Sequence, residues 1–246
     1  IMAYSQDETN FYLKRGPAED IAKFCIRDNI SIIDNSKINP MPISLLNIQL
    51  YDYQKLAVAA MLEFNQGVLI APVGSGKTFM GLKIIEARQQ KSLVIVPTQE
   101  IGFQWLNDCI SNNISSQFIK AGVKYNNTKT ITISTVQSLK KINLNDFGCV
   151  VVDEAHRCPA RVYAQTLDMI PAKYKYGLTD TAYRKDGLAD LIFWNLGPER
   201  YKIELTNVNT LNPAYKQIKT PWEFFNLNNN YTELISYLTT DESRNQ

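Results

Sequence analysis

The chain has few of the residues that mark metal clusters or disulfide frameworks. Its 246 residues include 4 cysteines and 1 histidine, and the cysteines form no CxxC pair. This spacing argues against a zinc knuckle, an iron–sulfur cluster or a secreted disulfide scaffold. The sequence therefore predicts free thiols in a reducing, cytoplasmic compartment, at Cys25, Cys109, Cys149 and Cys158.

Long apolar runs and a strong charge of one sign are also missing. The longest apolar runs, such as Val68–Ala71 and Val150–Val152, fall far short of the roughly 20 residues that span a bilayer. We therefore expect no contact with a membrane. Lys and Arg number 26 against 24 Asp and Glu, so the formal net charge is only +2. Total charge gives no argument for a nucleic-acid partner, and any basic surface must be local.

Three segments are expected along the chain. Residues 1–45 are predicted to form a small α+β accessory domain, followed by a main domain over residues 46–205. In the first, the expected elements are a strand at Phe11–Leu13, a helix from Pro17 to about Asp28, a strand-like run at Ile30–Ile33 and a proline-containing linker at Asn35–Pro42.

The main domain alternates short β-branched runs with longer helical stretches, which is the pattern of a parallel sheet with crossover helices. The predicted strands are Gly67–Ala71, Leu93–Val96, Thr130–Ser134, Cys149–Asp153, Tyr174–Leu178 and Tyr201–Glu204. The predicted helices are Asp52–Phe64, Lys77–Gln89, Glu100–Asn112, Pro159–Met169 and Leu188–Asn195. Continuously apolar strands indicate burial on both faces, so we expect an α/β fold with helices on both sides of the sheet.

A glycine-rich turn joins one of these strands to a helix. The segment Ala71–Thr78 ends in Gly-Ser-Gly-Lys-Thr, the ending of a phosphate-binding loop, although Ala71 stands where the strict pattern has Gly. Glycines let the backbone approach phosphates, and the helix N-terminus attracts anions. ATP is expected to contact Val73, Gly74, Ser75, Gly76, Lys77 and Thr78, with the Thr78 hydroxyl on Mg²⁺. The alternative is an ordinary strand-to-helix turn.

Two carboxylates end another buried strand, at Asp153 and Glu154. Ligands of open α/β sheets lie outside the carboxyl ends of the strands, so both acids should lie beside the glycine-rich turn. Asp153 would join the Mg²⁺ shell, and Glu154 would orient and deprotonate the attacking water. Together with Lys77 they are the expected catalytic residues. The alternative is an acidic pair that caps a helix or faces solvent.

Taken together, Ala-x-x-Gly-x-Gly-Lys-Thr at 71–78 and Asp-Glu-Ala-His at 153–156 resemble the first RecA-like domain of superfamily 2 helicases. The resemblance covers most of residues 48–246. The extension Arg184–Gly187 resembles the XPB-like and UvsW-like DNA-handling branch. The resemblance implies a RecA-like P-loop NTPase fold and an ATP-dependent DNA helicase or translocase. Its substrates would be single-stranded, duplex or branched DNA in recombination, repair or replication.

Weaker motifs gain roles from the same resemblance. Gln54, in the segment Tyr51–Ala57, would bond to the adenine edge. Other residues would contact a nucleic-acid backbone without reading its bases. These residues are Pro97, Thr98, Gln104, Thr135, Gln137 and Arg184.

The segment Gly177–Gly187 resembles the motif that links hydrolysis to strand movement. Thr179 and Thr181, together with His156 of the acidic motif, would act in this coupling. The family usually has a small residue between the two threonines and Pro after them, whereas this chain has Asp180 and Ala182.

Residues 206–246 are expected to be a linker and the start of a second RecA-like domain, which supplies arginine fingers in this family. This chain alone should then be monomeric, bind ATP weakly and hydrolyse it slowly. Three alternatives stay open at this point. They are a duplex translocase subunit of a restriction or remodelling complex, an RNA helicase, and a non-catalytic nucleic-acid-binding module.

Overall fold

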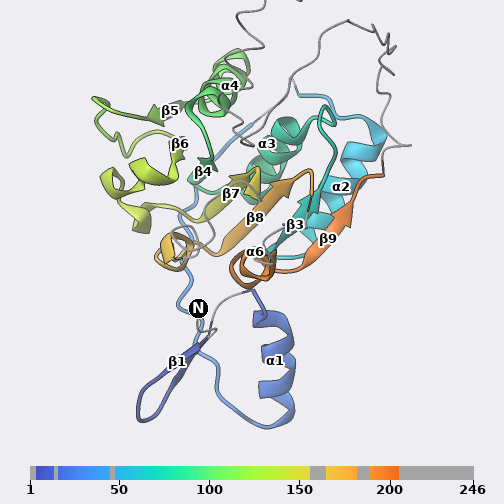
Figure 1. Ribbon diagram of the computed structural model, residues 1–246, viewed down its shortest axis with the longest axis vertical. Helices are drawn as coiled ribbons and strands as arrows, with labels where there is room; N and C mark the ends of the chain where they lie inside the picture. Colours follow the sequence, from blue (N-terminus) through green and yellow to red (C-terminus); the bar gives the residue numbers. More distant parts are fainter. Residues whose placement is uncertain (1–3, 14–15, 45–47, 156–164, 182–188, 205–246) are drawn as a thin grey trace, which may run out of the picture. The chain divides into compact units, whose positions relative to one another are not determined.

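Parallel strands form a sheet, as the alternating sequence pattern predicts, and it has seven strands (Figure 1). The computed structural model describes residues 4–13, 16–44, 48–155, 165–181 and 189–204. The strand order is β5-β6-β4-β7-β8-β3-β9. The strands are β3 (Gln66–Ile70), β4 (Ser92–Val96), β5 (Ser116–Ile119), β6 (Ile131–Thr135), β7 (Cys149–Asp153), β8 (Tyr174–Thr179) and β9 (Glu199–Lys202).

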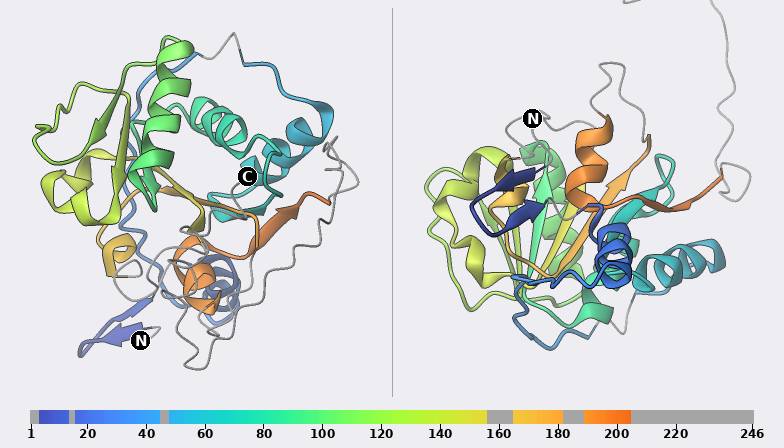
Figure 2. Two further views of the ribbon diagram at one scale, coloured as in Figure 1. Left: turned by 45° about the horizontal axis from the view of Figure 1, so that its top comes forward. Right: turned by 90° about the horizontal axis from the view of Figure 1, so that it is seen from below.

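Helical segments cover both faces of the sheet because alternate strand residues enter two separate apolar clusters (Figure 2). Leu69 and Val151 belong to the cluster under α2 (Asp52–Leu62), α3 (Lys77–Arg88) and α4 (Gln99–Ser111). On the other face, Val68 and Val150 pack with residues of α6 (Ala189–Leu196), η1 (Val136–Lys141) and η2 (Leu144–Asp146). Among the described residues, no helix is both long and apolar enough to cross a bilayer.

Most predicted elements of the main domain are confirmed, with ends shifted by up to two residues. The predicted helix Pro159–Met169 lies largely outside the described residues. The edge strand β5 was missed, because it carries polar residues at Ser116 and Gln117 and lacks the apolar run used to identify strands.

The strand-like run Ile30–Ile33 was predicted wrongly. Those residues are irregular, and Ile30 and Ile33 are 51% and 75% exposed. Isoleucines favour strands only where a neighbouring strand pairs with them, and no strand in the described part of the chain does so here. The linker that follows is bridged to the main domain, with Lys37 paired to Ala172 and Pro40 to Gln90.

Two compact units divide the chain, residues 1–209 and 210–246, and every described residue lies in the first. The proposed boundaries near residues 45 and 205 stay predictions. The predicted linker and second-domain start, residues 206–246, lie outside the described residues.

The N-terminal segment consists of a hairpin, β1 (Tyr4–Gln6) and β2 (Phe11–Leu13), and the helix α1 (Ala18–Arg27). Gly16 attaches it to the main domain. The Gly16 N–H donates to the Trp194 carbonyl at 2.8 Å, and Gln66 Nε2 donates to the Gly16 carbonyl at 3.0 Å. A Cβ atom at Gly16 would come within 2.1 Å of the Phe193 carbonyl oxygen, so this approach requires glycine.

The prediction of free thiols is confirmed for Cys25, Cys109 and Cys149, whereas Cys158 lies outside the described residues. Cys109 and Cys149 are fully buried, and burial raises the pKa of each thiol to about 12. Because the thiolate is the reactive form, iodoacetamide at about pH 8 should leave both thiols unmodified in the folded protein and alkylate them after denaturation. Peptide mass spectrometry measures this, and rapid alkylation of either thiol without denaturant would contradict the packing of the sheet.

Candidate functional site

The loop between β3 and α3 has a backbone that requires glycine at two positions. Gly74 and Gly76 have φ angles of 79° and 81°. A Cβ atom at Gly76 would also come within 2.4 Å of Gln54 Nε2. Gly76 is the N-cap of α3 and provides no side-chain acceptor, so the first N–H groups of the helix remain available to an external anion.

Lys77, the first residue of α3, forms an ion pair with Glu154 from the end of β7. Lys77 Nζ lies 3.3 Å from Glu154 Oε1, and the two side chains are only 10% and 13% exposed. Lys77 Nζ also donates to the Ala71 carbonyl at 3.3 Å. The expected meeting of the glycine-rich loop and the acidic strand end at one edge of the sheet is therefore confirmed.

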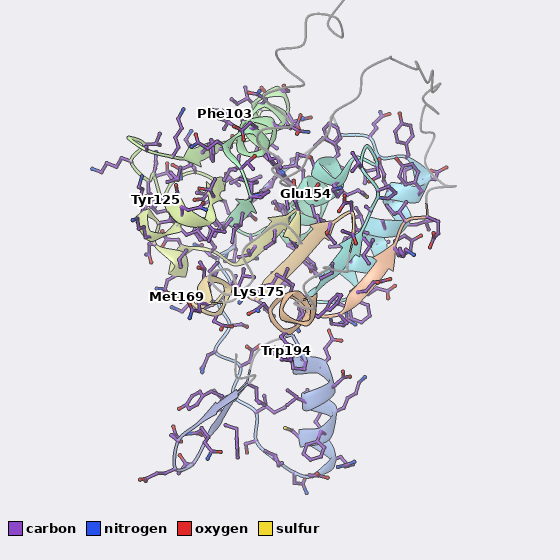
Figure 3. All side chains as sticks on the ribbon, in the orientation of Figure 1. Phe103, Tyr125, Glu154, Met169, Lys175 and Trp194 are labelled. Atoms are coloured by element: carbon purple, nitrogen blue, oxygen red, sulfur yellow. The ribbon has the colours of Figure 1, made fainter. Side chains whose placement is uncertain are left out.

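Glu154 has a φ angle of 48°, in the left-handed region that residues with a Cβ atom rarely occupy. This conformation turns the chain directly after β7. In Figure 3, Glu154 lies at the carboxyl end of β7, in the same half of the molecule as Phe103 of α4, while Lys175 and Trp194 lie toward the other end. The backbone strain is thus located where the side chain meets Lys77, as at many functional sites.

Asp153, the last residue of β7, is 5% exposed. Its Oδ2 accepts a hydrogen bond from Trp105 Nε1 at 2.7 Å, and its Oδ1 accepts one from the Glu154 N–H at 2.9 Å. Burial raises the pKa of Asp153, and the Trp105 hydrogen bond acts in the opposite direction. A buried carboxylate whose charge is incompletely compensated is suited to a nearby cation.

These side chains fit a phosphate and Mg²⁺. Thr78 and Asp153 supply oxygen donors, and Mg²⁺ typically takes one or two protein ligands while keeping its waters. No group of three or more potential metal-ligating side chains occurs within the described residues, so a protein-only metal cage is not formed by them. The buried Ser75 hydroxyl in the loop has no hydrogen-bond partner among those residues.

Gln54 contacts the loop itself. Its Nε2 donates to the Ser75 carbonyl at 2.7 Å, and its Oε1 accepts from the Tyr51 N–H at 2.9 Å. The Tyr53 hydroxyl donates to the same Ser75 carbonyl at 3.2 Å. Adenine recognition by Gln54 stays a prediction. Sequence reasoning missed the loop-anchoring roles of Gln54 and Tyr53, although the N-capping pattern at the start of α2 was a signal that this side chain turns back to the backbone.

The end of β8 is attached to the start of the loop. The Ala71 N–H donates to the Thr179 carbonyl at 2.8 Å, and the buried Thr179 hydroxyl donates to the Thr181 carbonyl at 2.8 Å. One of the three proposed coupling residues, Thr179, therefore contacts the start of the loop, and a second, Thr181, is bonded to Thr179. The third, His156, lies outside the described residues, as does Arg184.

A groove with a volume of about 610 Å³ lies beyond the carboxyl ends of β4 and β6. It brings together four of the residues proposed to contact nucleic acid, Pro97, Thr98, Thr135 and Gln137. Gln104 is exposed on α4 and is not among the lining residues.

Three lysines of this groove were missed by sequence reasoning, Lys120, Lys140 and Lys141. Lys120 follows the unpredicted strand β5, whereas the adjacent Lys140 and Lys141 were a visible basic pair shortly after Gln137. Trp105, directly after Gln104, was not among the predicted site residues, yet its buried side chain contacts Asp153.

Comparison with known proteins shows a family to which this chain is similar. The family described as "Type III restriction enzyme, res subunit" matches residues 47–184, more than half of the chain. The DNA 3'-5' translocase XPB2 of Sulfurisphaera tokodaii is 30% identical over 189 residues, covering 74% of this chain and 42% of that protein. The probable helicase D10 of Escherichia phage T5 is 30% identical over 196 residues, covering 78% of this chain and 43% of that protein.

Among solved structures, the UvsW helicase of bacteriophage T4 superposes with a TM-score of 0.60 and 20% identity, covering 79% of this chain and 80% of that one. This match shows the RecA-like α/β fold. The chain spans less than half the length of the two curated relatives named above. The predicted resemblance to superfamily 2 helicases of the XPB and UvsW type is confirmed.

Gln54→Ala tests the loop-anchoring contacts. The substitution removes one of the two donors to the Ser75 carbonyl and leaves the Tyr51 N–H without its Gln54 acceptor, so the free energy of unfolding should fall by about 1–3 kcal/mol. Urea denaturation without nucleotide measures this change. Gln104→Ala, at an exposed position of α4, is the matched control and should change stability by less than about 0.5 kcal/mol. Equal stabilities of the two variants would show that Gln54 does not anchor the loop.

Proposed function

Because this chain belongs to the family of type III restriction enzyme Res subunits, we propose that it carries the ATP-binding half of a superfamily 2 DNA helicase or translocase. Relatives named as XPB-type DNA 3'-5' translocases and a phage helicase support this proposal. The full protein would use ATP hydrolysis to move along duplex or branched DNA in recombination, repair or replication.

One observation supports the proposal most directly: the ion pair between Lys77 and Glu154, at 3.3 Å, beside buried Asp153. A loop that binds phosphate and a strand end that activates water must lie at the same edge of a sheet for hydrolysis. We propose that Val73, Gly74, Ser75, Gly76, Lys77 and Thr78 hold the phosphates of ATP, that Thr78 and Asp153 hold Mg²⁺, and that Gln54 lies against the adenine.

The chain's own groups suggest the order of events. Lys77 would leave Glu154 for the phosphate oxygens, so that the Glu154 carboxylate becomes available to orient water and accept its proton. Asp153 would stay fixed by its two N–H donors. Mg²⁺, when bound, supplies positive charge against the phosphates. Movement of the bound strand would then be coupled to hydrolysis by Thr179, Thr181 and His156.

The groove beside α4 is proposed to hold the DNA backbone. Pro97, Thr98, Thr135 and Gln137 offer hydroxyl, amide and main-chain groups, and the three lysines add positive charge. Contacts of this kind position a strand without reading its sequence, as a motor requires. Gln104 and Arg184 are proposed to extend the same interface. The matched family name favours one second candidate, a duplex translocase of a restriction complex, which moves on DNA without separating its strands.

Hydrolysis by the full protein tests the proposed function. DNA should stimulate ATP turnover, and Glu154→Gln should lower kcat by about 100-fold or more while nucleotide still binds, because only the water-activating carboxylate is lost. A coupled ATPase assay with single-stranded, duplex and branched DNA and with RNA measures the stimulation and the change in kcat. Titration with a fluorescent nucleotide measures whether Glu154→Gln still binds nucleotide. Glu8→Gln, at an exposed hairpin position, is the matched control.

Equal rates with and without every nucleic acid would contradict a motor. If strand displacement fails while displacement of a DNA triplex succeeds, the second candidate replaces the first.

The groove lysines make a separate prediction about salt. Lys140→Ala should weaken DNA binding equally for all sequences and reduce the slope of log K against log salt by about 1, since one phosphate contact is lost. Binding titrations at several salt concentrations measure the slope. Lys124→Ala is the matched control because Lys124 lines a different surface hollow, with Tyr125 and Asp146. If the slope of log K against log salt falls equally in both variants, the groove is not the DNA interface.

A further inference from the structure

Trp105 lies beneath the acidic site, although its neighbour Gln104 is exposed. The Trp105 indole is fully buried, and its N–H donates to Asp153 Oδ2 at 2.7 Å. A buried indole N–H needs an acceptor, but a main-chain carbonyl would satisfy it without burying a carboxylate. The choice of Asp153 as acceptor therefore indicates a function for the contact beyond satisfying the indole.

The helix that carries the phosphate-binding residues fixes the other side of the ring. A Cβ atom at Gly81 of α3 would come within 2.7 Å of Trp105 Cη2 and within 2.9 Å of Leu178 Cδ1. Gly81 lies one helical turn beyond Lys77. The indole thus occupies space that any side chain at this point of α3 would need, and it lies between α3 and Asp153.

The helix α4 connects the indole to the groove. Thr98 is the N-cap of α4, with its Oγ1 accepting from the Ile101 N–H at 3.4 Å, and Thr98, Gln99 and Glu100 line the groove. Trp105 lies seven residues beyond Thr98, which places it about two turns along the same face of the helix. One continuous helix therefore has its first turn in the groove and its middle against the acidic site.

We propose that Trp105 is a positioning residue, which holds Asp153 for Mg²⁺ and links the placement of that carboxylate to occupation of the groove. The proposal rests on the proposed function, in which the groove holds DNA and Asp153 holds the metal. A strand that contacts the first turn of α4 fixes the helix, and the indole N–H transmits the constraint to Asp153 Oδ2. The link is physical and direct, because one hydrogen bond joins the helix to the carboxylate.

The first test exchanges Trp105 for Phe in the full protein, which removes the N–H and keeps an aromatic ring. The Mg²⁺ concentration for half-maximal hydrolysis should rise about tenfold, as for other residues that orient a metal ligand. Stimulation of hydrolysis by DNA should fall several-fold, while the DNA affinity stays unchanged. Trp194→Phe is the matched control, because the N-terminal contact at Trp194 uses its main-chain carbonyl.

The second test does not depend on activity. In residues 1–246 carrying Trp194→Phe and Trp222→Phe, Trp105 is the only tryptophan, since this chain has 3. Its fluorescence should change when MgADP is added, and also when a DNA oligonucleotide is added without nucleotide. This measurement applies even if Trp105→Phe fails to fold.

The outcomes separate the two proposals. If the wild-type protein hydrolyses ATP without any response to nucleic acid, the proposed function itself fails. If the wild type responds but Trp105→Phe keeps the same Mg²⁺ dependence and DNA stimulation, the positioning role is wrong and the indole only fills the core. If the Trp105 fluorescence does not change when the DNA oligonucleotide binds, the proposed link between Asp153 and the groove is wrong.

Discussion

The ion pair between Lys77 and Glu154 joins two parts of the chain that the parallel sheet brings to one edge. Each side chain loses most of its hydration there, and a partly buried ion pair of this kind commonly returns little net stability. Glu154 also occupies a left-handed backbone conformation, which costs further free energy. The fold therefore maintains this arrangement through the rest of its packing, as expected of a site shaped for chemistry.

The arrangement is possible because two apolar clusters hold β7 and its neighbours on both faces. Strands β4 and β8 pair with β7 in parallel register, and β8 pairs with β3. The loop after β3, the acids after β7 and the threonines after β8 consequently share one edge. The groove lies beyond β4 and β6 on the same edge, so the proposed hydrolysis site and the proposed DNA path are separated by little more than the first turns of one helix.

Sequence alone predicted the features that depend on local patterns. The buried strand Cys149–Asp153 and the turn Ala71–Thr78 were both located by apolar runs next to glycines or acids, because parallel strands have a strong apolar signal. Polar edge strand β5 lacks that signal and was missed. Ile30–Ile33 has the signal without a partner strand, and the prediction there was wrong.

Local sequence patterns did not predict the contacts between distant parts of the chain. Trp105 and Asp153 are 48 positions apart in sequence, and only packing of α4 on the sheet brings them together. In the same way, Gln54 reaches the Ser75 carbonyl across 21 positions. Periodicity shows that such side chains face inward, but it does not show which polar group they meet there.

The attachment of the N-terminal segment has an evolutionary consequence. The Gly16 N–H donates to the main-chain carbonyl of Trp194, so this contact does not itself require a particular residue type at position 194. Position 16 has no such freedom, because even a methyl group would collide with the Phe193 carbonyl. A homologue with a larger residue aligned to Gly16 should therefore carry its accessory segment in a different orientation, or carry none.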